Sequence, residues 1–158
     1  MGKDRPSISP SQREYLSAKE SRHILLVEDN KSDVFLMREA LTAANVAAEL
    51  YVVSDGENAF RFIDATDADD EASCPTLIIL DLNLPKKTGL EVLQYVRRSK
   101  KCTNAPVLIV TSSDSQTDRQ AATKLGANGY FRKPSGYEAY LKIGEIVRDL
   151  LADLPPSC

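Results

Sequence analysis

Residues 77–85 read Leu-Ile-Ile-Leu-Asp-Leu-Asn-Leu-Pro, a run of four apolar residues followed by a carboxylate and a turn. Such a run predicts a β-strand that is covered on both faces, and Pro85 and Gly89 end it. Asp81 then stands where the strand emerges. In open α/β sheets, ligands bind beyond the carboxyl ends of the strands. An isolated Asp at this place more often caps a turn, so the other strand ends decide how Asp81 is interpreted.

The same strand-and-turn pattern occurs five times, and a helical pattern follows each strand. Alternation of this kind predicts parallel strands joined by right-handed crossovers, with helices on both faces of the sheet. Asn30 or Ser32 is expected to cap the first of these helices, and Ser113 with Gln116 fits a capping box for the fourth. The predicted strands are 24–27, 49–53, 77–80, 107–110 and 129–132, and the predicted helices are 32–44, one around 59–63, 90–98, one ending at 125, and 137–151.

Length and composition indicate one folded domain over residues 23–151, with tails at 1–22 and 152–158. The 158 residues carry a net charge of −3, which argues against a nucleic-acid surface. The sequence has no apolar run of membrane-spanning length and no signal-peptide core. Cys74, Cys102 and Cys158 are odd in number and lack metal-ligand spacing, so we expect reduced thiols in a cytoplasmic protein.

Charged or polar side chains follow several of the predicted strands. Glu28 and Asp29 follow the first strand, Asp81 the third, Thr111 the fourth and Lys133 the fifth. Because the carboxyl ends of parallel strands share one edge of the sheet, these side chains are expected to converge. The predicted site therefore combines three carboxylates, a hydroxyl and an ammonium.

Three carboxylates this close repel one another, by roughly 4 kcal/mol for each pair at about 4 Å in an effective dielectric near 20. One lysine does not offset this, so either a carboxylate is protonated or a divalent cation lies among them. Oxygen ligands favour Mg²⁺ over zinc, and the backbone carbonyl of Asn83 is a further candidate ligand. With the charge neutralised, Asp81 is suited to accept a phosphoryl group as an acyl phosphate, with Lys133 and Thr111 contacting the phosphoryl oxygens.

Together these motifs resemble the receiver domain of bacterial two-component response regulators. Each motif alone is weak, but their order and spacing over residues 23–151 are specific. The resemblance implies a flavodoxin-like receiver fold, with five parallel strands in the order 2-1-3-4-5. The run at 83–87 and the acidic loop before the third strand are similar to single-domain regulators that partner bacteriophytochromes. The matching segments are Leu-Leu-Val-Glu-Asp at 25–29, Leu-Asp-Leu-Asn-Leu-Pro at 80–85 with Gly89, Val-Thr-Ser at 110–112, and 126–134 from Gly-Ala through Tyr130 to Lys-Pro.

The resemblance also implies roles for individual residues. Asp81 accepts the phosphoryl group from a histidine of a sensor histidine kinase or a histidine phosphotransfer protein. Mg²⁺ is bound by Glu28, Asp29, Asp81 and the carbonyl of Asn83. Glu28 replaces the commoner Asp, and this longer ligand favours a water-mediated contact to the ion.

Three further roles follow from the same resemblance. Lys133 contacts the phosphoryl group, and Thr111 moves to hydrogen-bond with it. Tyr130 is the switch aromatic that turns inward when Thr111 shifts, although a half-buried strand tyrosine is the plainer reading of its residue type. The peptide bond between Lys133 and Pro134 is often cis in this family.

The expected function is that of a single-domain response regulator, a signalling phosphoacceptor rather than an enzyme. Phosphorylation would switch protein–protein contacts, and a homodimer through the last helix is a further hypothesis. Three alternatives compete with this reading. A phosphatase of the haloacid dehalogenase type needs a second acid at the position of Asn83. A nucleotide- or flavin-binding protein needs a glycine-rich loop after the first strand, and this sequence has none there. A pseudo-receiver, which never accepts phosphate, would be expected to lack Asp81, Lys133 or the acidic pair.

Overall fold

The computed structural model describes residues 22–153, in which five strands alternate with five helices. The tails predicted at 1–22 and 152–158 therefore lie outside the described residues, except for Arg22, Ala152 and Asp153. None of the described helices is long and apolar enough to cross a membrane. The elements are β1 His23–Val27, α2 Lys31–Ala43, β2 Glu49–Val53, α3 Gly56–Ala68, β3 Leu77–Leu80, α4 Gly89–Arg98, β4 Val107–Thr111, α5 Gln116–Lys124, β5 Gly129–Arg132 and α6 Tyr137–Ala152.

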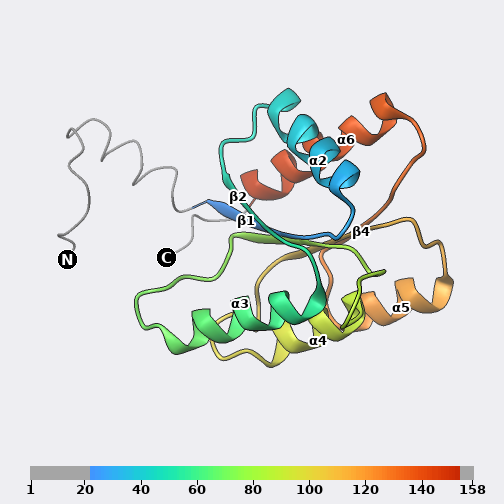
Figure 1. Cartoon of the computed structure of the whole chain (residues 1–158). Helices are drawn as coiled ribbons and strands as arrows, with labels where there is room; N and C mark the ends of the chain where they lie inside the picture. The colour runs from blue at the N-terminus through green and yellow to red at the C-terminus, as the bar shows by residue number, and fades with distance from the viewer. Residues whose placement is uncertain (1–21, 154–158) are drawn as a thin grey trace, which may run out of the picture.

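The five strands form one parallel sheet in the order β2-β1-β3-β4-β5, as predicted. Helices α2 and α6 cover one face of this sheet, and α3, α4 and α5 cover the other (Figure 1). This arrangement follows from right-handed crossovers, because the order of the strands reverses direction between β1 and β3. The carboxyl ends of β1 and β3 lie side by side, with Val27 opposite Leu80. The fold thus places the segments after these two strands next to each other.

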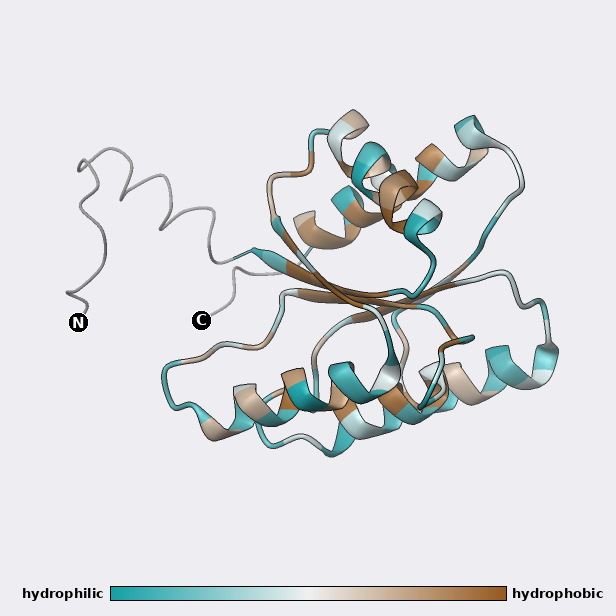
Figure 2. Cartoon of the chain, in the orientation of Figure 1, coloured by the Kyte–Doolittle hydropathy of each residue, from teal (hydrophilic) through white to brown (hydrophobic). Residues whose placement is uncertain are grey.

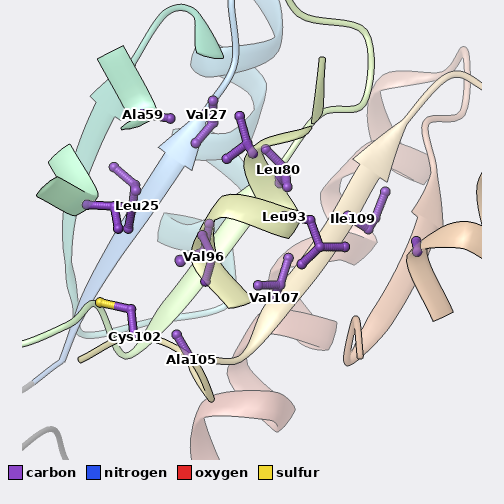
Figure 3. Close-up of a cluster of buried hydrophobic side chains, with 14 of the residues drawn as sticks. Leu25, Val27, Ala59, Leu80, Leu93, Val96, Cys102, Ala105, Val107 and Ile109 are labelled. Atoms are coloured by element: carbon purple, nitrogen blue, oxygen red, sulfur yellow. The ribbon is translucent and has the colours of Figure 1, made fainter. Parts of the chain in front are cut away.

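The core consists of two apolar layers, one on each side of the sheet. Strands β3 and β4 are buried along their whole length, and β1 is buried after His23. Figure 2 shows these strands as a hydrophobic band between helices that carry both hydrophilic and hydrophobic residues. Successive side chains point to opposite faces, so one strand supplies both layers. The layer under α3, α4 and α5, part of which Figure 3 shows, includes Leu25, Val27, Ile78, Leu80, Leu93, Val96 and Ile109, and the opposite layer includes Ile24, Leu26, Met37, Leu77, Ile79, Val110 and Ile143.

Helix α2 begins at the acidic end of β1 and packs closely against α6. Of the two predicted caps, Asn30 is the one used, and its side chain accepts hydrogen bonds from the backbone N–H groups of Ser32 and Asp33. A Cβ atom at Gly144 of α6 would lie 2.1 Å from the carbonyl oxygen of Ala40. Only glycine permits this approach, which keeps α2 fixed over the sheet beside the site.

Two local predictions are wrong. Helix α5 is capped by Ser115, which accepts a hydrogen bond from the N–H of Asp118, and not by a capping box of Ser113 and Gln116. The hydroxyl of Ser113 instead donates to the carboxylate of Asp118. The acidic loop that was predicted before the third strand is shorter than expected, because α3 continues to Ala68, with Thr66 buried and its hydroxyl donating to the carbonyl of Phe62.

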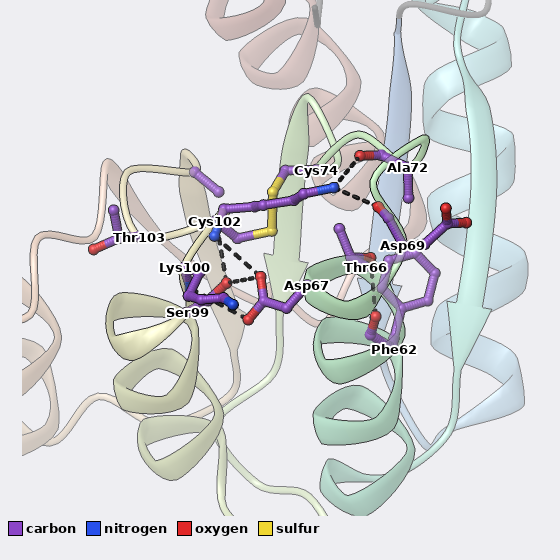
Figure 4. The surroundings of a disulfide bond; sticks show 12 residues. Phe62, Thr66, Asp67, Asp69, Ala72, Cys74, Ser99, Lys100, Cys102 and Thr103 are labelled. Carbon is purple, nitrogen blue, oxygen red and sulfur yellow. Dashed lines mark hydrogen bonds between the residues drawn. A yellow bond between two sulfur atoms is a disulfide. The ribbon is translucent and has the colours of Figure 1, made fainter.

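The prediction of reduced thiols is also wrong for two of the three cysteines. Cys74 and Cys102 form a disulfide, with their Cα atoms 5.6 Å apart (Figure 4). The bond joins the loop before β3 to the loop after α4, at the amino-terminal end of the sheet, opposite the carboxyl ends of the strands. Hydrogen bonds support the same contact: Asp67, in the last turn of α3, accepts from the hydroxyl of Ser99 and the N–H of Lys101, and the ammonium of Lys101 donates to the carbonyl of Ala72 in the loop before β3. Sequence spacing did not reveal this contact, because it depends on β3 and β4 being neighbours. Cys158 lies outside the described residues.

Candidate functional site

The ends of four strands bring the predicted site residues to one edge of the sheet. Glu28 and Asp29 follow β1, Asp81 follows β3, and Lys133 follows β5. Thr111 is the last residue of β4 and is fully buried. The convergence that was predicted from strand order is therefore present.

The ammonium of Lys133 lies at the centre of this group. Its Nζ is 2.9 Å from Oε1 of Glu28, 2.9 Å from Oδ2 of Asp81 and 2.7 Å from Oδ2 of Asp33. Only 11% of the lysine side chain and 4% of the Glu28 side chain are exposed. An ammonium has three donors, so these three carboxylates use all of them. Burial by itself lowers the pKa of Lys133, but the three charge-assisted hydrogen bonds outweigh it and raise that pKa.

Glu28 is held in the site at an electrostatic cost. Burial raises the pKa of its carboxyl to about 7, against the lowering effect of Lys133. Both of its oxygens have partners, because Oε2 accepts a hydrogen bond from the N–H of Asn30 at 3.1 Å and Oε1 accepts from Lys133. A positive charge beside Glu28 would favour its ionised form.

Three carboxylates are close enough to share such a charge. Glu28, Asp29 and Asp81 each offer one oxygen, and these oxygens lie within 4.8 Å of one another. Asp29 is exposed, so one side of the group is open to solvent. Hard oxygen donors with open positions suit a divalent cation such as Mg²⁺ or Mn²⁺. The residues present therefore fit the cation that was predicted from sequence.

The loop after β3 holds Asp81 in place. The backbone N–H of Asn83 donates to Oδ1 of Asp81 at 3.0 Å, while Oδ2 accepts from Lys133. Asp81 is 6% exposed. A Cβ atom at Gly89 would lie 2.3 Å from the carbonyl oxygen of Asp81, so the start of α4 approaches this loop more closely than other residues allow. The Asn83 carbonyl remains a predicted ligand.

Thr111 and Tyr130 occupy the side of the site toward α5. The hydroxyl oxygen of Thr111 accepts from the N–H of Ser113 at 3.3 Å. Tyr130 in β5 is half-buried, its hydroxyl donates to the carbonyl of Ser113 at 3.1 Å, and the guanidinium of Arg119 lies 4.2 Å from its ring. Both residues are thus connected to the loop that follows β4.

Two features of the site were not available from the sequence. The peptide bond between Lys133 and Pro134, which is often cis in the family that the sequence resembles, is trans here, since the described residues contain no cis peptide bond, and Lys133 reaches the carboxylates. Asp33 was not among the predicted site residues, although its carboxylate makes the shortest contact to Lys133. The sequence predicts that Asp33 lies in the first turn of the helix after Asn30, but it does not predict the contact of Asp33 with a residue 100 positions away.

Comparison with known proteins identifies the class. The family model of the response regulator receiver domain matches residues 24–143. The chain belongs to this family. It is accordingly a signalling phosphoacceptor rather than an enzyme, and the family implies a cognate histidine kinase. This membership overrules the phosphatase and the nucleotide- or flavin-binding alternatives.

Phytochrome response regulators are among its relatives. The chain is 36% identical to the response regulator Rcp1 of a Synechocystis species over 120 residues, which are 76% of this chain and 82% of Rcp1. The structure of the Mn²⁺-bound form of Rcp1 matches with a TM-score of 0.75 and 33% identity, over 85% of this chain and 99% of that one. The structure of the phosphorylated cyanobacterial phytochrome response regulator RcpA matches with a TM-score of 0.76 and 34% identity, over 85% and 98%.

Proposed function

We propose that Asp81 accepts a phosphoryl group from a histidine of a sensor kinase or phosphotransfer protein, in a reaction that depends on Mg²⁺. The observation that carries the proposal is the position of Asp81. It lies at the end of a central strand, nearly buried, within the group of three carboxylates and 2.9 Å from the ammonium of Lys133. The phosphorylated state of RcpA and the Mn²⁺ in Rcp1 support the same reading.

The transfer is a substitution at phosphorus. A carboxylate oxygen of Asp81 forms an O–P bond while the P–N bond to the donor histidine breaks, and the electron pair of that bond returns to the imidazole. Lys133 donates to the phosphoryl oxygens and so offsets their charge. Glu28, Asp29, Asp81 and the carbonyl of Asn83 would hold the Mg²⁺, which when bound would supply further positive charge to these oxygens.

We further propose that phosphorylation changes the surface around Thr111 and Tyr130. The hydroxyl of Thr111 would exchange its contact with the N–H of Ser113 for one with the phosphoryl group. Because the hydroxyl of Tyr130 is held by the carbonyl of the same Ser113, a shift of this loop releases the tyrosine to turn inward. The equilibrium between the two arrangements would then control the binding of a partner or of a second copy, in a cytoplasmic setting.

Intact-mass spectrometry tests the first step. The protein is incubated with Mg²⁺ and acetyl phosphate beside Asp81→Asn, with Asp70→Asn as a control that removes an exposed acid of the distant α3–β3 loop. We expect one added phosphoryl group in the parent and the control, and none in Asp81→Asn or without Mg²⁺. A parent protein that gains no phosphoryl group, and does not bind beryllofluoride either, would be a pseudo-receiver and would refute the proposal.

Light scattering and partner binding test the second step. Under phosphorylating conditions we expect the parent protein, but not Asp81→Asn, to change its oligomeric state or its affinity for a partner. Identical switching by Asp81→Asn would refute the role of the phosphoryl group in output. A monomer with and without phosphoryl donor would refute the homodimer.

A further inference from the structure

Asp33 is a carboxylate of the site that lies outside the group of potential cation ligands. Within the described residues that group contains Glu28, Asp29 and Asp81 only. Asp33 instead contacts Lys133, at 2.7 Å, and its side chain is 20% exposed. Among the hydrogen bonds found in residues 22–153, its carboxylate accepts only from this ammonium. Asp33 therefore faces the lysine and not the cation position.

The local backbone fixes Asp33 in this direction. The Asn30 side chain accepts from the N–H of Asp33 at 3.2 Å, so the first turn of α2 is anchored to the end of β1. At the other end of the helix, the close approach of Gly144 to Ala40 holds α2 against α6. The carboxylate is thus presented to Lys133 by a rigid element, as precise positioning requires.

The other two partners of Lys133 change during the proposed reaction. Asp81 becomes an acyl phosphate, and a carboxylate oxygen of Glu28 belongs to the cation group. Asp33 does neither. We propose that Asp33 is a positioning residue, an inference that rests on the proposed function. Asp33 keeps the ammonium of Lys133 directed at the reacting oxygen while Glu28 contacts the cation and Asp81 forms the acyl phosphate.

Phosphorylation kinetics with acetyl phosphate test this role. Loss of one charge-assisted hydrogen bond to the ammonium is expected to slow phosphorylation of Asp33→Asn about tenfold at saturating donor. Asp33→Glu keeps the carboxylate and should recover part of the rate. The matched control is Glu138→Gln, which removes an acid from the first turn of α6 on the same face of the sheet. It should leave the rate unchanged.

Two further measurements separate positioning from a merely structural effect. Calorimetry should give a Mg²⁺ affinity for Asp33→Asn within about threefold of the parent, because Asp33 is not in the cation group. The ¹⁹F spectrum of the beryllofluoride adduct should change in Asp33→Asn, at the fluorine that contacts the ammonium. In a Lys133→Ala background, Asp33→Asn should cause no further loss of rate, since the residue acts through that lysine.

The outcomes distinguish this inference from the proposed function. If the parent is phosphorylated on Asp81 but Asp33→Asn reacts as fast or faster, Asp33 does not position Lys133, and the inference fails alone. An Asp33→Asn variant that slows phosphorylation equally with and without Lys133 would also overturn it. A parent that accepts no phosphoryl group would instead refute the function on which the inference rests.

Discussion

Reduction of the disulfide between Cys74 and Cys102 is expected to destabilise the domain without dismantling the native loops. The bond closes a loop with a sequence separation of 28. In the chain-entropy treatment, a loop of about 29 residues contributes about 3.5 kcal/mol by restricting the unfolded chain. For a domain of about 130 residues, with an unfolding entropy of about 2.1 cal/mol/K per residue, this corresponds to a decrease in Tm of roughly 13 °C.

The native loops are held by other contacts as well. Asp67 accepts hydrogen bonds from the hydroxyl of Ser99 and the N–H of Lys101, and the Lys101 ammonium donates to the carbonyls of Asp69 and Ala72 (Figure 4). These contacts do not require the S–S bond. The effect of reduction should therefore arise mainly in the unfolded state, which becomes less compact, so the urea m-value should rise while the midpoint falls.

The assay is urea and thermal unfolding of a Cys158→Ala background, with and without a phosphine reductant. The Cys158→Ala change prevents thiol exchange with the disulfide. A Cys74→Ala and Cys102→Ala double variant should match the reduced protein and be insensitive to reductant. Mass spectrometry after alkylation checks the oxidation state.

Two results would refute this reasoning. A Tm that changes by less than about 2 °C on confirmed reduction would show that the entropy of the closed loop is not what the disulfide contributes. Alkylation of both cysteines in the unreduced, unfolded protein would contradict the disulfide itself. Cytosolic thiols are normally kept reduced. The contribution of the disulfide to the stability of the domain therefore depends on the redox state of the compartment.

Three further predictions concern the site and the stability of the domain. The folded-state pKa of Glu28 is raised to about 7. The stability that Glu28 contributes to the metal-free protein is therefore fully present below about pH 4.5 and is lost as pH rises through 7, by on the order of 3 kcal/mol. Thermal melts of the parent and of Glu28→Gln over this pH range check the prediction, because the variant should lack this dependence on pH. Gly144→Ala should destabilise by about 1–3 kcal/mol in urea unfolding, because its Cβ meets the Ala40 carbonyl, whereas Gly136→Ala, with open space around it, should change stability by less than about 0.5 kcal/mol. Arg97→Ala should cost about 2 kcal/mol by the same measurement, because its guanidinium donates to two backbone carbonyls in the loop after α4 and to two just after α5. An unchanged urea midpoint would contradict this prediction.

Sequence alone determined the fold class and most of the site. The apolar runs that end at Val27, Leu80 and Val110 predict central strands, and alternation with helices predicts parallel crossovers. In a parallel sheet every strand ends at the same edge, so residues directly after the strands converge without knowledge of any side-chain contact. That is why Asp81 and Lys133 could be brought together from their positions in the chain.

Tertiary structure decided the contacts that do not follow from strand order. Asp33 is four residues beyond Asp29, on a helix, and it meets Lys133 only because α2 is anchored at a particular angle over the end of β1. Cys74 and Cys102 meet because two loops lie over neighbouring strands, and neither their spacing nor their number indicates it. Local patterns encode where strands and helices begin and end, whereas distances between side chains from separate elements depend on how those elements pack, which no local pattern contains.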